Sequence, residues 1–187
     1  MPALAPGACN TSTAPASPLG SGAFTLGAIV DEAGAVPELI ESNNHMAGSL
    51  IGFGSGPDLI VTSVTGPPSA NAPFTLSSTV CNQGTQPSPG ADVRFYASAD
   101  ATITGTLDSP ASPDVLLGSR TVAALQPGQC DTGPADAIAP PGPGAFYLGA
   151  IVDEPGGVAE LIESNNHTVG SLIGLGNRPD RADHVRR

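Results

Sequence analysis

The side chains of this sequence best suited to binding chemistry gather in an acidic segment that occurs twice. Its second occurrence holds the oxygen-bearing residues Asp153, Glu154, Glu160, Glu163, Asn165 and Asn166. The first occurrence holds the matching residues Asp31, Glu32, Glu38, Glu41, Asn43 and Asn44. Ca²⁺ takes about six to eight oxygen ligands. A loop crowded with such groups is therefore a candidate calcium site, or a carbohydrate site that works through calcium.

A structural role is the alternative interpretation of the same segment. Carboxylate and Asn side chains accept hydrogen bonds from backbone N–H groups, and Asn tolerates left-handed turns. The spacing of the acidic residues does not match an EF-hand. We therefore favour side chains that shape a loop, expect no required cofactor, and keep Ca²⁺ as the alternative.

Three cysteines are the next residues with reactive side chains. Cys81 lies on an alternating strand-like run and Cys130 begins another, 49 residues later. If the two strands are neighbours in a sheet, a disulfide can join them. It would stabilise the fold by about 4 kcal/mol on the chain-entropy model and would indicate an oxidising compartment. Two free buried thiols are the alternative, and Cys9 is the repeat equivalent of Cys130.

Motifs and charge argue against an enzyme and against nucleic acid. Six basic residues face seventeen acidic ones, for a formal net charge of −11, so a phosphate backbone would be repelled. The sequence has no Gly-x-Ser-x-Gly elbow and no zinc-type spacing of Cys and His. The glycine-rich segment Gly52–Gly56 lacks the Lys of a phosphate-binding loop. No apolar run approaches the roughly 20 residues that span a bilayer, and Met1–Ala5 do not have a signal-peptide pattern.

An internal repeat organises the elements that must position these residues. Residues 24–58 and 146–180 are identical at 26 of 35 positions at an offset of 122. We interpret residues 57–177 as a complete unit, residues 1–56 as the second half of another, and residues 178–187 as an Arg-rich polar tail. A repeat of this length has the size of a whole β-sandwich domain.

Alternation of apolar and polar residues predicts strands in the complete unit. Inward-facing sets are Leu59 and Val61, then Phe74, Leu76, Ser78 and Val80, then Val93, Phe95 and Ala97, and finally Phe146, Leu148, Ala150 and Val152. Clusters of Gly, Pro and Gln separate these runs as turns. We expect an all-β fold: an immunoglobulin-like or fibronectin III-like antiparallel sandwich of about seven strands, plus the partial second copy.

The order of several segments resembles the CARDB domain, a cell-adhesion-related module of bacterial surface and secreted proteins. They are PDLIVTSV at the start of the unit, FTLSSTVCNQGTQPSPG, VRFYASADATIT, DVLLGSRTVAALQPGQ, and AIVDEPGGVAELIESNN near its end. The resemblance implies a fibronectin-like sandwich outside the cell, often in tandem arrays. It implies adhesion as a role, without assigning a binding site.

These observations predict a non-enzymatic extracellular module, located outside or on the surface of a bacterium, that serves as a stalk, spacer or adhesion domain. Its partner would be a protein or a surface glycan, with no nucleic acid and no membrane insertion. The alternative is a Ca²⁺-binding or carbohydrate-binding module that uses the acidic loop. We also expect the chain to self-associate by strand pairing through residues 20–56, because a half sandwich leaves strand edges and apolar surface open.

Overall fold

A computed structural model describes residues 3–17, 20–71, 73–107, 109, 111–137, 142–154 and 156–177. The expected Arg-rich tail, residues 178–187, lies outside the described residues. The strands along the chain are β1 (Gly22–Ile29), β2 (His45–Phe53), β3 (Leu59–Thr65), β4 (Ser69–Ala70), β5 (Phe74–Asn82), β6 (Ala91–Ser98), β7 (Val115–Val122), β8 (Cys130–Ala137), β9 (Gly144–Val152) and β10 (His167–Leu175). Short 3₁₀ turns cover Glu41–Asn43 and Glu163–Asn165. No helix within the described ranges is long and apolar enough to cross a membrane.

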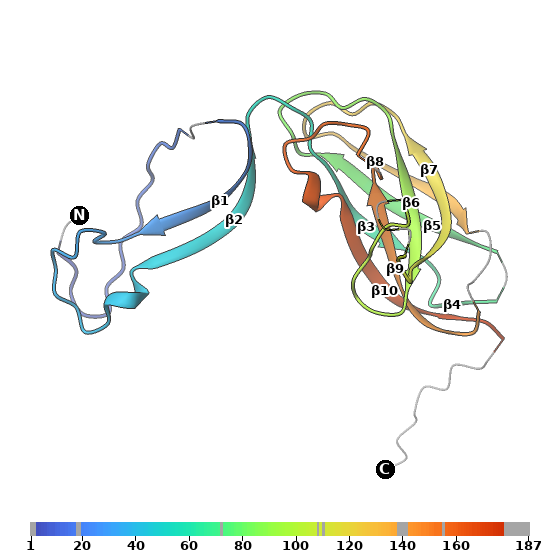
Figure 1. The fold of residues 1–187 in the computed structure, drawn as a ribbon, viewed down its shortest axis with the longest axis horizontal. Coiled ribbons are helices and arrows are strands. Elements are labelled where there is room, and N and C mark those ends of the chain that lie inside the picture. The colour runs from blue at the N-terminus through green and yellow to red at the C-terminus, as the bar shows by residue number, and fades with distance from the viewer. Residues whose placement is uncertain are drawn as a thin grey trace, which may run out of the picture.

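Strands β3 to β10 form a sandwich of two sheets (Figure 1). One sheet has the order β4-β10-β9-β6-β7 and the other has the order β3-β5-β8. The pairings are antiparallel except that the two-residue β4 runs parallel to β10. The all-β sandwich is therefore confirmed, and β4 adds a short strand to the seven expected.

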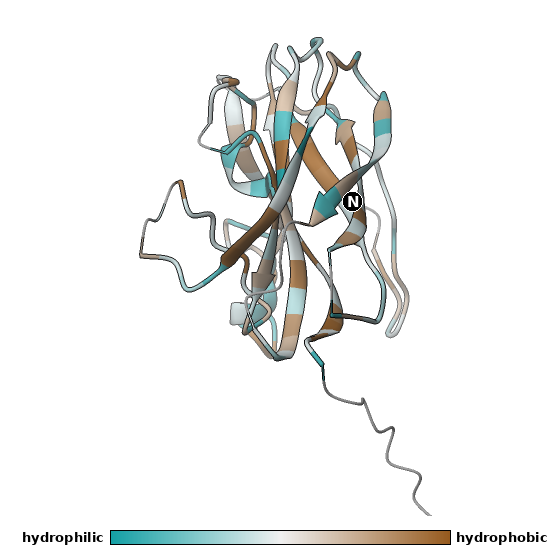
Figure 2. Cartoon of the chain, turned by 90° about the vertical axis from the view of Figure 1, so that its right-hand side faces the viewer, coloured by the Kyte–Doolittle hydropathy of each residue, from teal (hydrophilic) through white to brown (hydrophobic). Residues whose placement is uncertain are grey.

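Hydrophobic and hydrophilic residues alternate along several strands of the sandwich (Figure 2). The buried apolar residues of both sheets form one core cluster. In β5, Leu76, Ser78 and Val80 are buried at every second position. In β6, Val93, Phe95 and Ala97 are completely buried. Period-two patterning thus predicts the inward face of these strands correctly, because successive side chains of a strand point to opposite faces of a sheet.

The outer face of β6 and β9 is also covered. Tyr96 points away from the main core, as its position beside Phe95 requires, yet it is completely buried and packs with Ile103 and Ile151. Ile103 belongs to the loop between β6 and β7, which lies over the sheet. It comes so close to Gly149 that a Cβ there would lie 2.3 Å from the Ile103 side chain.

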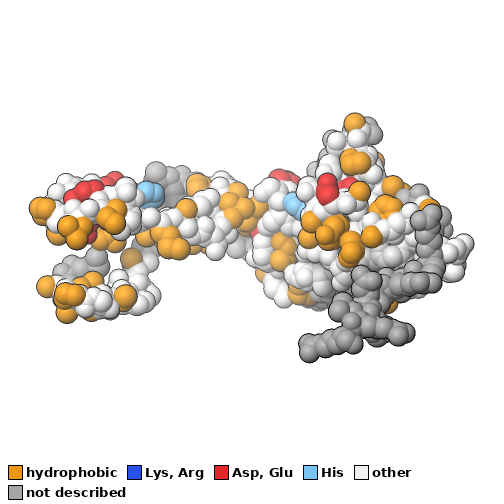
Figure 3. Space-filling view, turned by 90° about the horizontal axis from the view of Figure 1, so that it is seen from below, with side chains coloured by type: hydrophobic (Ala, Val, Ile, Leu, Met, Phe, Trp, Pro, Cys, Tyr) orange, Lys and Arg blue, Asp and Glu red, His pale blue; other side chains and the backbone are white. Residues whose placement is uncertain are grey.

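Strands β1 and β2 form a separate two-stranded sheet. Figure 1 shows this hairpin apart from the sandwich, connected to it after the end of β2. Almost every residue of the hairpin is exposed. In the space-filling view, hydrophobic side chains are spread along this N-terminal arm (Figure 3). The half unit predicted from the repeat therefore forms its own strands but has no core.

The acidic loop as the candidate functional site

The second acidic segment forms the loop between β9 and β10, and its first carboxylate holds the turn. Asp153 adopts a left-handed backbone conformation with φ of 56°. Its Oδ2 accepts a hydrogen bond from the Val158 backbone N–H at 2.7 Å. Burial raises the pKa of the Asp153 carboxyl, although hydrogen bonds from the backbone of Val158 and Gly157 act in the opposite direction. This is the side-chain-to-backbone bonding that stabilises loops.

Glu160 fastens the loop to the start of β3. Its Oε1 accepts a hydrogen bond from the Leu59 backbone N–H. Its Oε2 accepts one from Asn166 Nδ2 at 2.5 Å, and Glu163 Oε1 accepts one from the Glu160 backbone N–H at 2.8 Å. Burial raises the pKa of Glu160 to about 7, against the lowering effect of the bonds from Leu59 and Asn166.

Asp58 forms a buried polar contact with the same loop. Asn165 Nδ2 donates a hydrogen bond to Asp58 Oδ1 at 2.9 Å, and Gln83 Nε2 donates one to Asp58 Oδ2 at 2.9 Å. The Asp58 backbone N–H donates in turn to Asn82 Oδ1 at 3.1 Å. Asp58 is not among the site residues expected from the sequence. The signal was present, because Pro-Asp recurs at 57–58 and 179–180 at the boundary of the repeat.

Glu154 connects the loop to the outer face of the larger sheet. Tyr96 donates a hydrogen bond to Glu154 Oε2, and the Leu107 backbone N–H donates to Oε1 at 2.6 Å. The pKa of the Tyr96 hydroxyl is raised by burial and by its bond to Glu154. A cavity of about 370 Å³ lies beside this pair and is lined by Asp153, Glu154 and Glu163 among others.

The oxygen atoms of the loop are held apart by these separate bonds. Within the described part of the chain, no group of three or more His, Cys, Asp or Glu side chains is placed to hold a metal ion. Among the residues that the structure describes, the side-chain oxygens of Asn165 and Asn166 find no hydrogen-bond partner, although both are buried. Asp153, Glu154, Glu160, Glu163 and Asn165 thus all take part in hydrogen bonds that shape the loop or fasten it, and calcium binding by this loop stays a prediction.

The first acidic segment repeats the internal bonds of this loop. Asp31 accepts hydrogen bonds from the backbone N–H groups of Ala35 and Val36 at 2.9 and 2.7 Å. Glu41 accepts one from the Glu38 backbone N–H at 2.9 Å. Asn44 Nδ2 donates to Glu38 Oε2 at 2.6 Å. Asn43 ends the 3₁₀ turn, as Asn165 does in the second loop. The two candidate ligand sets are therefore two copies of one loop structure.

A disulfide joins Cys81 on β5 to Cys130 on β8, with their Cα atoms 4.0 Å apart. The two residues face each other in the antiparallel pairing of these strands, so the strands are the sheet neighbours that the disulfide needs. Cys9 is exposed and free. A second connection was not expected: Arg120 of β7 forms an ion pair with Asp131 of β8, and its Nε donates to Ser78 Oγ at 2.9 Å. It links the two sheets along one side.

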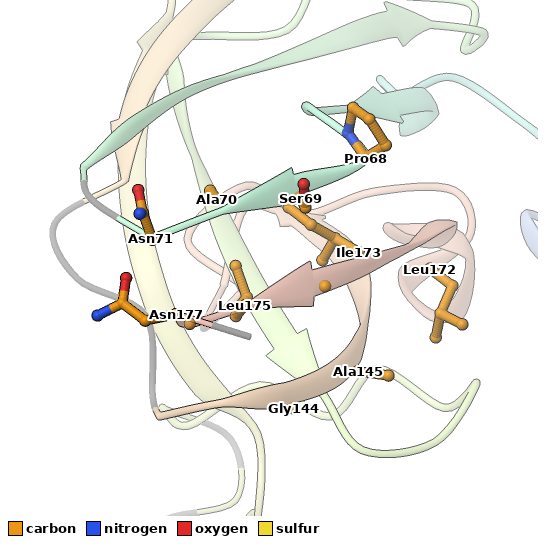
Figure 4. A pocket seen from close by; sticks show the side chains of 12 residues that line it. Pro68, Ser69, Ala70, Asn71, Gly144, Ala145, Leu172, Ile173, Leu175 and Asn177 are labelled. Atoms are coloured by element: carbon orange, nitrogen blue, oxygen red, sulfur yellow. The ribbon is translucent and has the colours of Figure 1, made fainter. Parts of the chain in front are cut away.

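A groove of about 690 Å³ lies at the end of the sandwich away from the acidic loop between β9 and β10 (Figure 4). Its walls come from β4, the beginning of β9 and the end of β10. Backbone, small apolar side chains and Leu172, Ile173 and Leu175 make most of its lining. None of the lining residues that the structure describes carries an ionisable side chain.

The fold and its cystine define an all-β sandwich module with a polar loop at one end. The chain belongs to the CARDB family, whose model matches residues 56–169. No curated protein matches the chain.

Several solved structures are similar to this chain. A crystal structure of a CARDB domain from Pyrococcus furiosus in complex with di-metal ions is 23% identical, with a TM-score of 0.49, over 67% of this chain and 99% of that one. A domain of a putative cell surface protein from Methanosarcina acetivorans is 21% identical, with a TM-score of 0.48, over 70% of this chain and 98% of that one. A β-glucosidase from Erythrobacter marinus is 18% identical, with a TM-score of 0.41, over 64% of this chain and 15% of its own.

Proposed function

We propose that this chain is a non-enzymatic extracellular module that acts as a spacer or adhesion domain of a surface or secreted protein. Membership of the CARDB family supports an adhesion-related role outside the cell. The disulfide between Cys81 and Cys130 supports an oxidising compartment, where such bonds form and persist.

The observation that carries the spacer role is the path of the chain through the sandwich. The unit begins at Pro57, whose carbonyl accepts a hydrogen bond from the Leu161 backbone N–H in the acidic loop, before β10 starts. β10 ends at Leu175, which pairs with Ala70 at the other end of the strand. Nine residues of β10 separate these points, or about 30 Å. A chain that begins and ends at opposite ends of a rigid unit extends with every unit added.

The acidic loop contributes stiffness in this proposal. Glu160 and Asn165 bond to the first residues of β3, so the loop braces the end at which the preceding segment is attached. Burial of these bonds is consistent with a supporting role, since buried polar groups in folded proteins are normally paired.

Single-molecule force spectroscopy tests the proposal. The full chain is held by handles at its two ends and pulled, with and without a reducing agent. A spacer should resist force until the whole unit of residues 57–177 unfolds in a single step. The disulfide loop of 49 residues should withhold about 18 nm of extension until it is reduced. A unit that extends without measurable resistance, in either redox state, would contradict the proposed role.

A further inference from the structure

The N-terminal hairpin exposes the surface that its copy in the sandwich buries. Leu148 of β9 is 1% exposed, whereas its equivalent in β1, Leu26, is 49% exposed. Val152 is completely buried, whereas its equivalent Val30 is 49% exposed. The same reversal holds for the pairs Val158 and Val36, Leu161 and Leu39, Ile162 and Ile40, Ile173 and Ile51, and Leu175 and Phe53. A contiguous apolar face of this kind marks an interaction surface.

The exposed hairpin already has the backbone of the buried one. Every described pairing of β1 with β2 matches a pairing of β9 with β10 at the offset of 122, from Gly22 opposite Phe53 to Ile29 opposite His45. The irregularity after Thr25 recurs at the same place in the second hairpin. Docking therefore requires little rearrangement of the backbone, which lowers the entropy cost of binding.

The structure also shows which segment covers such a hairpin. β9 pairs with β10 along one edge and with β6 along the other, where Ala150 lies opposite Phe95. β1, by contrast, pairs with β2 alone among the described strands. An open strand edge beside an apolar face accepts an added strand. The counterpart of β6 is thus the first element that the hairpin lacks.

Polar groups of the first loop match the same missing segment. In the sandwich, Glu160 accepts from the Leu59 backbone N–H, Asn165 donates to Asp58, and Glu154 accepts from Tyr96. The equivalents in the first loop are Glu38, Asn43 and Glu32. No described residue takes the place of Leu59, Asp58 or Tyr96 beside them. These groups favour a partner that opens with Pro-Asp-Leu and carries an aromatic hydroxyl next to a buried Phe.

We propose that residues 22–53 bind a polypeptide segment that carries a further first half of the same unit, equivalent to residues 57–137 but distinct from them, and so complete a second sandwich. The partner supplies a strand to the open edge of β1 and an apolar sheet to its inner face. Its Pro-Asp-Leu segment binds the first acidic loop.

This chain cannot cover its own hairpin with residues 57–137. In the place of β9 and β10, Phe53 would lie beside Ala70, where Leu175 lies now, while Pro57 stays at the other end near Leu161. The chain from Phe53 to Pro57 reaches at most about 14 Å, and a nine-residue strand such as β10 spans about 30 Å. A cis exchange is therefore out of reach.

Further copies of this chain cannot cover every hairpin in this way either. Each copy brings one first half, residues 57–137, and two second halves, residues 22–53 and 144–175. If copies of the chain pair with one another, each first half can cover only one second half, so one second half per chain stays uncovered. The occupant that fits is a first half other than residues 57–137 of this sequence.

The test adds a separate polypeptide of residues 57–137 to the full chain during refolding. We expect a complex with one fragment per chain, and amide exchange across Phe24–Ile29 at least 100-fold slower than in the chain alone. Leu26→Asp places a charge on the inner face and should abolish the complex. Leu50→Asp is the matched control, because Leu50 and its equivalent Leu172 are both exposed, and it should leave the complex intact.

Three results would overturn the proposal. The first is a complex that survives Leu26→Asp, which would mean that the fragment has displaced β3 to β8 of the intact unit. The second is protection of Phe24–Ile29 that rises with the concentration of the full chain alone, which would mean that a second copy covers the hairpin. The third is the absence of a complex while the same fragment binds a polypeptide of residues 142–177.

A fused chain tests the same proposal without a separate fragment. Residues 57–145 are placed directly before Phe24, so that the hairpin follows a first half in the same order as β9 does. Substitution of Leu26 by Ala should then destabilise the fused chain as strongly as substitution of Leu148. A fused chain in which Phe24–Ile29 still exchange rapidly would also overturn the proposal.

Discussion

The two hairpins of this molecule have nearly the same sequence and the same pairing register but opposite surroundings. β9 is buried over its second half and β10 buries Ile173 and Leu175 in the sandwich core, whereas nearly every residue of β1 and β2 is exposed. The loops that connect them share their internal hydrogen bonds, from Asp153 to Val158 in one and from Asp31 to Val36 in the other. Local sequence therefore determines the hairpin and loop geometry, whereas burial is determined by the segment that packs against them.

The largest difference between the two halves should come from their cysteines. Replacement of Cys81 and Cys130 by Ser removes the cross-link and should lower the free energy of unfolding by about 4 kcal/mol on the chain-entropy model. Replacement of the repeat-equivalent Cys9, which is exposed and free, should change it by less than about 0.5 kcal/mol. Urea denaturation measures both. Equal effects at Cys9 and Cys130 would show that the pairing is not the one described.

Deletion of one equivalent side chain should sharpen the comparison. Leu148→Ala leaves a cavity in the core and should cost about 3 kcal/mol, whereas Leu26→Ala removes a half-exposed side chain and should cost less than about 0.5 kcal/mol. Denaturant midpoints of the two variants provide the measurement. A loss at Leu26 as large as that at Leu148 would mean that the hairpin is covered in solution.

The pattern of the sequence predicted those parts of the fold that depend on alternation. Leu76, Val80 and Phe95 lie inside because a strand with one buried face must alternate. The pattern could not predict that Tyr96 is buried, because the loop that carries Ile103 has no periodicity. Nor could it predict the bridge from Arg120 to Asp131, which depends on how the two sheets are aligned and not on the spacing within either strand.

The sequence predicted which residues of the acidic loop carry oxygen atoms, but not which groups those atoms contact. The recurrence of Asp153, Glu160 and Asn165 at 31, 38 and 43 marked the loop as a unit. Their partners Asp58 and Leu59 lie about a hundred residues earlier in the chain, beyond any local pattern. Residue types that suit both calcium and backbone amides do not by themselves show which hydrogen bonds they form, and the structure supplies those contacts.

The acidic loops should also differ in their response to pH. Burial raises the pKa of Glu160 in the folded chain to about 7, from an ordinary value of 4.5. The folded chain therefore binds more protons than the unfolded chain between these values, and the free energy of unfolding should fall as the pH rises from about 4.5 to 7. Glu160→Gln should flatten the dependence of the unfolding free energy on pH. The matched variant Glu38→Gln should retain this dependence, because it leaves Glu160 unchanged.

Denaturation curves collected at several pH values test this difference. Glu160→Gln keeps an acceptor oxygen for the Leu59 backbone N–H but cannot take up a proton in this range. A slope that persists unchanged in Glu160→Gln would assign the pH dependence to another group.

The smallest expected effect is that of calcium. Carboxylate oxygens of both loops accept hydrogen bonds from backbone N–H, Asn and Tyr groups. Added Ca²⁺ should therefore change the melting temperature by less than about 1 °C, as expected of a ligand without affinity for the folded state. Isothermal titration calorimetry should record no binding heat. A clear rise in melting temperature with Ca²⁺ would contradict this prediction. If the rise disappears in Asp153→Asn, calcium binds the sandwich loop. If it disappears in Asp31→Asn, calcium binds the hairpin loop.

Amide hydrogen exchange on dilute full chain tests most directly whether equivalent strands differ through their surroundings alone. Amides of Phe146–Val152 should exchange only through global unfolding. Amides of Phe24–Ile29 should exchange orders of magnitude faster, because a two-stranded sheet without a core is marginally stable. Equal protection of the two strands would contradict the account.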